Sequence, residues 1–185
     1  VDDSMIASIL VDVNAREVDK TFDYHVPEQF EEVIEIGQRV SVPFGPRFII
    51  GYVLELKEES ELESLKDIVD VIDIIPSLTP ELIDLGNTLS ISNTSPLVSI
   101  YQAMLPRALK GKYSKKVIAD DLSLLPLELS LKFNRYKEAK MDDSMKPYLK
   151  EIKKQIAQNN MDVVNEISQA NQVRYIKKLV LIDET

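Results

Sequence analysis

Residues 40–48 restrict the fold of this chain more than any other stretch, because they place two prolines and a glycine between two apolar runs. Proline cannot donate a hydrogen bond to a strand ladder, and glycine accepts turn dihedrals that other residues avoid. The pattern therefore predicts a hairpin with strands at about 38–42 and 48–57. Apolar stretches rich in β-branched residues predict three further strands, at 5–13, 21–26 and 66–74.

Two helices are expected after these strands. Thr79 and Pro80 are the residue types favoured at a helix N-cap and at the first helical position, and leucines follow them at helical spacing. A second apolar pattern of helical period begins at Leu97 and stops before Pro106. We therefore expect residues 5–109 to form a small β-barrel-like domain with two helices.

The second part of the chain, residues 110–185, has a different pattern. A basic segment, 107–116, spans the start of this part and has five basic residues and no acidic one, which predicts a connector. Apolar periodicity then predicts three helices and a strand, at 146–158, 161–167, 173–178 and 179–182. Three helices followed by a strand are typical of a winged-helix domain, so the predicted fold class is α+β with two domains.

Charge is distributed unevenly between the two parts. The formal net charge is −9, but residues 1–109 hold 20 acidic and 7 basic residues (net −13), whereas residues 110–185 hold 11 acidic and 15 basic residues (net +4). A strongly acidic first part argues against a protein that coats nucleic acid or an anionic membrane along its whole length. The two parts are expected to have different partners.

The sequence offers little material for catalysis or cofactor binding. It has no cysteine and a single histidine, His25, which excludes a thiolate zinc site and a disulfide framework. The five glycines fit neither a Walker phosphate loop nor a dinucleotide fingerprint. Apolar runs such as 48–54 have the length of a strand and are too short to cross a membrane. We expect no enzyme activity, no cofactor and no metal in this chain, and no membrane partner.

Short motifs occur in a fixed order along the first part: Thr21-Phe22-Asp23-Tyr24, Gly37-Gln38-Arg39-Val40, Val42-Pro43-Phe44-Gly45, Gly51-Tyr52-Val53, Leu65-Lys66-Asp67-Ile68 and Leu105-Pro106. In this combination and order, the sequence closely resembles the N-terminal region of the primosomal protein N′ (PriA) family of replication-restart DNA helicases. The motifs carry the resemblance over residues 5–109, and the winged-helix pattern extends it to 110–185.

The resemblance implies a DNA-binding fragment. In that family the first domain binds the 3′ end of the nascent leading strand at a stalled fork, a winged helix engages fork DNA, and an ATP-driven 3′–5′ helicase core follows. ATP and zinc belong to that core, whose Walker motifs and cysteine cluster do not occur here, so this chain corresponds to the N-terminal region or to a truncated paralogue. Expected partners are forked or 3′-tailed DNA, single-strand-binding protein and other primosome proteins, in the bacterial cytoplasm beside the nucleoid.

The family's pocket for the 3′ terminus corresponds by motif position to Phe22, Asp23, Gly45 and Lys66. A carboxylate at Asp23 accepts a hydrogen bond from a free 3′-hydroxyl and repels a 3′-phosphate. Phe22 offers a wall for the terminal base, and Gly45 lets a backbone approach closely. Lys66 offsets the charge of a nearby phosphate. Without the resemblance, the favoured interpretations are a core aromatic for Phe22, a solvated acid for Asp23 and turn dihedrals for Gly45, and Lys66 by itself indicates no function.

In the second domain, the predicted contacts with the DNA backbone are the basic residues Lys153, Lys154, Arg174, Lys177 and Lys178. The alternative interpretation of these residues is a solvated basic face that only separates two domains. Three positions depart from the family's pattern: Ser92 and Asn93 replace an aromatic pair, and Val98 replaces a glycine. We expect these differences to affect how the helical face of the first domain packs.

Two other functions are compatible with the residues. The acidic first domain suits a protein-interaction module that docks a basic partner, such as a primosome component or a complex of single-strand-binding protein. Asp23 also suits an acid or base in an enzyme, but no second catalytic group accompanies it in the sequence.

Overall fold

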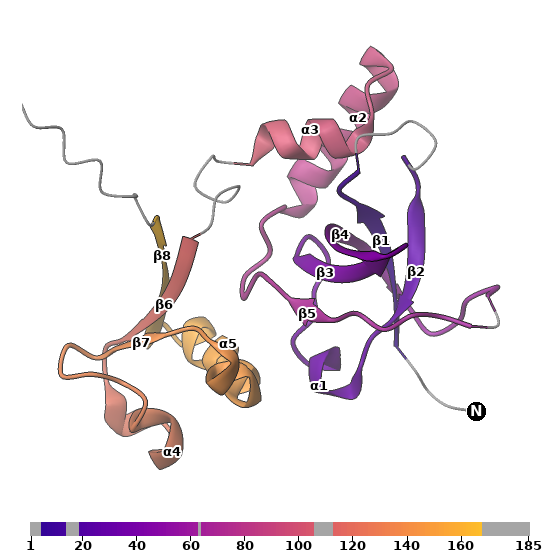
Figure 1. The fold of residues 1–185 in the computed structure, drawn as a ribbon. Coiled ribbons are helices and arrows are strands. Elements are labelled where there is room, and N and C mark those ends of the chain that lie inside the picture. Colours follow the sequence, from indigo (N-terminus) through magenta and orange to yellow (C-terminus); the bar gives the residue numbers. More distant parts are fainter. Residues whose placement is uncertain (1–4, 14–18, 63, 106–112, 168–185) are drawn as a thin grey trace, which may run out of the picture.

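The computed structural model describes residues 5–13, 19–62, 64–105 and 113–167 (Figure 1). The first part is an antiparallel sheet of five strands with two helices against it, and the second is an antiparallel sheet of three strands with short helices. This arrangement confirms the predicted α+β class. Within the described ranges, no helix combines the length and the apolar character that crossing a bilayer requires.

The five-stranded sheet has the strand order β2-β1-β4-β3-β5. Its strands are β1 (Ile6–Val11), β2 (Thr21–His25), β3 (Arg39–Phe44), β4 (Arg47–Lys57) and β5 (Asp70–Val71), and the short helix α1 (Glu28–Glu31) follows β2. The predicted hairpin is present as β3 and β4, with Val42 opposite Ile49.

The sheet does not close into a barrel, so the barrel-like prediction is wrong on this point. Strand β5 has two residues and pairs only with β3, and an isolated bridge between His25 and Asp67 is the link to β2 at the other edge. Of the residues predicted as a strand at 66–74, Asp70 and Val71 form β5. This strand is too short to pair along both β3 and β2. One consequence is that β2 remains an edge strand of the sheet.

Side chains alternate between two apolar layers of the sheet. Ile9, Val40 and Val53 belong to the main core, whereas Leu10 and Tyr52 belong to a second cluster that includes residues of the helices. The helices are α2 (Pro80–Asn93), capped by Thr79 as predicted, and α3 (Leu97–Met104).

The two helices pack closely because α2 carries a glycine where α3 crosses it. A Cβ at Gly86 would lie 2.3 Å from the Tyr101 ring, so a side chain there would push the helices apart. Val98, one of the departures from the family's pattern, is buried in this layer, whereas Ser92 and Asn93 are exposed at the end of α2.

The three-stranded sheet has the order β7-β6-β8. Its elements are β6 (Tyr113–Ala119), η3 (Leu122–Leu124), α4 (Leu127–Ser130), β7 (Glu138–Lys140), η4 (Asp143–Tyr148), α5 (Leu149–Ala157) and β8 (Met161–Ile167). The helix predicted at 146–158 is present as η4 and α5.

Residues 161–167 form a strand, and their prediction as a helix is wrong. Residues 161–167 contain two adjacent valines, a residue type that favours strands, and each of the seven positions has a partner on β6. A short apolar run has no periodicity that separates helix from strand, and β6 decides the outcome. Lys115 and Lys116, predicted in a connector, are part of β6. The elements predicted at 173–182 lie outside the described residues, so the winged helix stays a prediction.

The two parts of the chain share a core. Buried side chains of both belong to one continuous apolar cluster, which includes Ile34 and Ile74 from the first part and Leu149 and Ile152 from α5. In Figure 1, α5 lies on the side of the three-stranded sheet that faces the first part. The junction between the two parts therefore has apolar side chains at its centre.

Candidate functional site

Edge strand β2 carries Phe22 and Asp23 on its two opposite faces, because consecutive strand residues alternate. Phe22 packs edge-on against Phe44 at the end of β3, with 5.4 Å between the ring centroids. The Lys20 ammonium lies 5.4 Å from the centroid of the Phe22 ring. Phe22 is therefore a half-buried aromatic side chain next to a cation, rather than a fully enclosed core residue.

Gly45 occupies the turn that joins β3 to β4, directly after Phe44. Its φ is +59°, a left-handed conformation that side chains other than glycine adopt at a cost. A Cβ at this position would meet no atom within 4 Å. The backbone conformation therefore favours glycine at this position, and its exposed surface leaves the turn accessible to a ligand.

The Asp23 carboxylate is held by three donors of the protein. The Ser8 hydroxyl donates to Oδ1 (2.8 Å), the Ser60 hydroxyl donates to Oδ2 (2.6 Å), and the Lys57 ammonium lies 2.8 Å from Oδ2. Burial by itself raises the pKa of Asp23, but the hydrogen bonds from Lys57, Ser60 and Ser8 outweigh it and hold the pKa below its usual value. Asp23 is thus ionised at neutral pH.

This carboxylate retains capacity for a further donor. Two carboxylate oxygens offer roughly four acceptor positions, and the protein occupies three of them. The Asp23 side chain is 16% exposed, so it opens to solvent at the sheet edge. About one additional hydroxyl or amine hydrogen can therefore be accepted without displacing a protein group.

The main chain of Lys66 lies at the same edge of the sheet. The N–H of His25 donates to the carbonyl of Lys66 (2.9 Å), which places residues 66 and 67 beside the end of β2. His25 Nδ1 lies 2.8 Å from Asp67 Oδ1. The Lys66 side chain is exposed.

The four predicted residues of the 3′-end site therefore surround one edge of the sheet without forming a single compact cluster. Phe22 meets the Gly45 turn through Phe44, Lys66 lies at the end of β2, and Asp23 is on the opposite face of that strand. The cation that pairs with Asp23 is Lys57, not Lys66.

Sequence reasoning missed the partners of Asp23. Ser8 lies opposite Asp23 in the β1–β2 register, which no local pattern shows. A weak indication of a role for Lys57 was present in the sequence, because it is the single basic residue in 48–65, a segment that contains five glutamates. Ser60 follows it in the same acidic run, whose composition indicates only a solvated loop.

The predicted backbone contacts of the second part have different surroundings. Lys153 donates to the Val33 carbonyl (2.7 Å) and pairs with Glu35, both in the first part, and its side chain is 18% exposed. Lys154 pairs with Glu151 on its own helix, and its side chain is 58% exposed. Arg174, Lys177 and Lys178 lie outside the described residues. Of the five, Lys154 is the one found on an open surface, and Lys153 belongs to the junction.

Three more lysines of the second part face acids of the first. Lys146 lies 3.3 Å from Asp70, Lys150 pairs with Glu32, and Lys115 lies 3.4 Å from Asp73. Lys115 also donates to the carbonyl of Ile72. Some of the opposite charges of the two parts therefore pair with each other within the chain and stabilise the junction.

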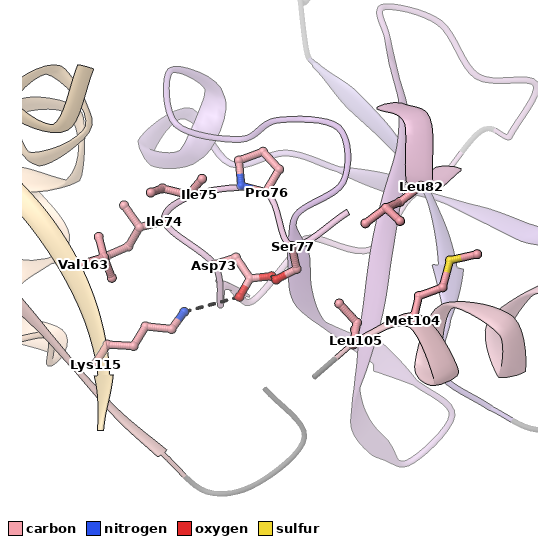
Figure 2. A pocket seen from close by; sticks show the side chains of 10 residues that line it. All are labelled: Asp73, Ile74, Ile75, Pro76, Ser77, Leu82, Met104, Leu105, Lys115 and Val163. Carbon is pink, nitrogen blue, oxygen red and sulfur yellow. Dashed lines mark hydrogen bonds and ion pairs between the residues drawn. The ribbon is translucent and has the colours of Figure 1, made fainter. Parts of the chain in front are cut away.

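A cavity of about 450 Å³ lies at this junction. Figure 2 shows Asp73, Ser77 and Lys115 at its polar side, and apolar side chains such as Leu82 and Met104 on its other wall. These polar groups interact with one another through the Lys115–Asp73 ion pair and a hydrogen bond from the Ser77 hydroxyl to Asp73. Across the described residues, no group of three or more acidic, histidine or cysteine side chains is arranged to hold a metal ion.

The open sheet, its helix layer and the ionised carboxylate define a small β-rich domain with a polar, accessible edge. Residues 8–106 match the family model described as the PriA 3′DNA-binding domain (3′BD). Because this match covers more than half of the 185 residues, the chain belongs to the PriA 3′ DNA-binding domain family. It carries a DNA-binding domain of the PriA type.

A curated relative extends the similarity beyond this domain. The replication restart protein PriA of Bacillus subtilis (strain 168) is 35% identical over 176 residues, which make up 94% of this chain and 22% of that protein. The chain therefore spans about a fifth of the length of this relative. The similarity reaches into the second part, which the family model does not cover.

Proposed function

We propose that this chain recognises the 3′-hydroxyl end of a DNA strand, as found on the nascent leading strand at a stalled replication fork. The observation that carries the proposal is the Asp23 carboxylate, ionised and 16% exposed at the sheet edge, with three of its roughly four acceptor positions filled. A 3′-hydroxyl supplies the one hydrogen that this group still accepts. A terminal 3′-phosphate supplies further negative charge instead and is repelled.

Residues on the opposite face of β2 and at its end suit the other parts of a strand terminus that passes around this edge of the sheet. Phe22 and Phe44 provide aromatic surface for the last base, with Lys20 beside them. The open Gly45 turn allows the backbone to approach, and the exposed Lys66 offers a charge to a phosphate. End recognition of this kind depends little on counterion release, so it is compatible with a first part of net charge −13.

The test compares two oligonucleotides of one sequence that end in a 3′-hydroxyl or a 3′-phosphate. We expect the unmodified protein to prefer the hydroxyl by about tenfold or more, because a hydrogen bond to a charged group contributes about 1.5–3 kcal/mol. Asp23→Ala should lose this preference. Asp84→Asn, which changes an exposed carboxylate on α2, is the matched control and should keep it. Equal binding of both ends by the unmodified protein would exclude the proposal.

The wider role follows from the relatives and is also a proposal. We infer that the chain contributes DNA binding to replication restart in the bacterial cytoplasm beside the nucleoid, with forked DNA as substrate. Its binding requires neither ATP nor zinc, and it hydrolyses no ATP. Binding measured with and without EDTA or ATP should be the same, and released phosphate would contradict this assignment.

The alternative function, an acidic module that docks primosome proteins or single-strand-binding protein, rests on the acidic residues of the first part. Four of them, Glu32, Glu35, Asp70 and Asp73, already pair with lysines of the second part. The glutamates at 58, 59 and 61 remain exposed and are the surface that such a partner would use. If the chain bound a basic partner and no DNA, this alternative would replace our proposal.

A further inference from the structure

The turn between α4 and β7 concentrates positive charge in the second part. Residues 131–141 contain four basic side chains, Lys132, Arg135, Lys137 and Lys140, and a single acid, Glu138. That acid lies 3.2 Å from Lys116 on the neighbouring strand. Tyr136 stands among the basic residues with 63% of its surface exposed. We name residues 132–137 the aromatic–basic turn.

Hydrogen bonds give the aromatic–basic turn a defined shape. The Asn134 side-chain oxygen accepts the N–H groups of Tyr136 (2.8 Å) and Glu138 (3.1 Å), and the Asn134 N–H donates to the Glu138 carbonyl (2.9 Å). Lys137 adopts a φ of +59° within this arrangement. An exposed aromatic ring is therefore presented by a built turn, so that little conformational entropy remains to be lost when a ligand binds.

The Arg135 guanidinium lies over one face of the Tyr136 ring. The guanidinium carbon lies 4.6 Å from the centroid of the Tyr136 ring, and Nη2 donates to the tyrosine hydroxyl (2.6 Å). The polar partners found for Lys132 and Lys137 are neutral oxygens, the Ser144 hydroxyl and the Asp120 carbonyl. Asp142 and Asp121 interact with Lys132 and Lys137 only through space, without a direct ion pair, so the charge of these two lysines is less fully paired than that of the junction lysines.

We propose that the aromatic–basic turn is a second DNA site, which binds single-stranded DNA by stacking a base on Tyr136 and placing phosphates near Lys132 and Arg135. Single-strand binders combine aromatic platforms with cations in this way. The site shares with the proposed function the premise that the chain binds DNA, but it does not use the 3′-hydroxyl. In Figure 1, α4, which leads into the turn, is well separated from the five-stranded sheet, so the two sites would hold different stretches of DNA.

The experiment uses the full chain and a labelled single strand of about 20 nucleotides that ends in a 3′-phosphate, so that end recognition contributes little. Tyr136→Ala should weaken binding at least about fivefold, the lower limit of the contribution of one stacked base. Tyr136→Phe keeps the ring and should bind like the unmodified chain. Leu127→Ala removes exposed apolar surface on the adjacent helix and should also leave binding unchanged.

Two further probes separate base stacking from charge attraction and from protein docking. On a strand of abasic sites the effect of Tyr136→Ala should vanish, whereas Arg135→Ala should still reduce the salt dependence of binding. Equal binding by Tyr136→Ala and the unmodified chain would overturn the proposal. So would a poly-glutamate peptide that binds through Tyr136 while the strand does not, because the turn would then be a protein-docking surface.

The same panel distinguishes the two DNA proposals. Asp23→Ala should reduce binding only to strands with a 3′-hydroxyl, and Tyr136→Ala should reduce binding to both kinds of strand by the same factor. An effect of Tyr136→Ala with none of Asp23→Ala would leave the second site standing and exclude end recognition. An effect of Asp23→Ala with none of Tyr136→Ala would support end recognition and exclude the second site.

Discussion

Asp23 and Asp73 lie in two different regions of the first part and have the same kinds of partner, serine hydroxyls and cations. Asp23 has two serines, Ser8 and Ser60, and one cation, Lys57, whereas Asp73 has one serine, Ser77, and two cations, Arg39 and Lys115. In both, burial raises the pKa and the hydrogen bonds from cation and serine outweigh it, so the pKa is held below its usual value. Chemistry alone does not separate the two groups.

Accessibility separates them. Asp73 is 4% exposed, and Arg39, also 4% exposed, donates to it through its main-chain N–H (2.9 Å), Nε (2.9 Å) and Nη2 (2.7 Å). Those donors and the Ser77 hydroxyl fill the Asp73 acceptors, which leaves no room for a ligand. Asp23 lies on an edge strand, with one acceptor position open. A polar network therefore marks a binding site only where the fold leaves one of its positions accessible.

The largest expected effect comes from the buried network. Asp73→Ala should lower the free energy of unfolding by about 3–5 kcal/mol, because it leaves the buried Arg39 guanidinium without its partner. Urea denaturation measures this loss. In conditions where the variant is folded, its preference for a 3′-hydroxyl should be unchanged. A loss below about 1 kcal/mol would show that Asp73 is not the anchor that the geometry indicates.

Acidification should weaken the same network in the unmodified chain. The pKa of Asp73 is depressed in the folded state, so its contribution to stability is complete above the unfolded value of 3.8 and is lost as the pH falls from there through the folded pKa. Asp73→Asn cannot titrate at this position. The difference in unfolding free energy between the two proteins should therefore be largest near neutral pH and shrink below about pH 4. A constant difference would contradict the assignment.

Asp23→Asn should have a smaller effect on stability and a clear effect on binding. Its ion pair is solvent-accessible, and such pairs contribute up to about 1 kcal/mol, so the urea midpoint should move little. The neutral amide no longer repels a terminal phosphate, and the preference for a 3′-hydroxyl should fall. A loss of stability as large as that of Asp73→Ala would remove the distinction between the two aspartates.

The smallest effects are expected for two adjacent lysines. Lys153→Ala removes hydrogen bonds to Val33 and Glu35 across the junction and should cost about 0.5–1.5 kcal/mol of stability, with DNA affinity unchanged. Lys154→Ala should leave stability unchanged and lower the salt dependence of DNA binding slightly, since its side chain is 58% exposed. The opposite pattern would show that the junction opens when DNA binds.

Much of the first part is predictable because its signals are local. Pro43, Gly45 and Pro46 locate the β3–β4 turn, and Thr79 and Pro80 locate the start of α2, since each residue restricts its own backbone. The second part is less predictable. Residues 161–167 become β8 because β6 offers a partner, and sequence periodicity in a seven-residue run does not contain that information.

The candidate site shows the same limit. Motifs indicate Phe22, Asp23, Gly45 and Lys66, and the structure places them around one edge of the sheet. Their partners come from distant positions: Ser8 from β1, Phe44 from β3 and Lys57 from β4. Lys153, expected on DNA, is instead engaged by the first part.

The sequence by itself determined the α+β class, the hairpin, the helix starts, the family and the opposite charges of the two parts. These properties depend on residue types and on spacings of a few residues. Only the tertiary structure decided that the sheet stays open, that Asp23 is accessible while Asp73 is enclosed, and that the lysines of α5 neutralise acids of the first part. Burial and pairing depend on which distant segments meet, so the same carboxylate chemistry becomes an anchor in one place and an open acceptor in another.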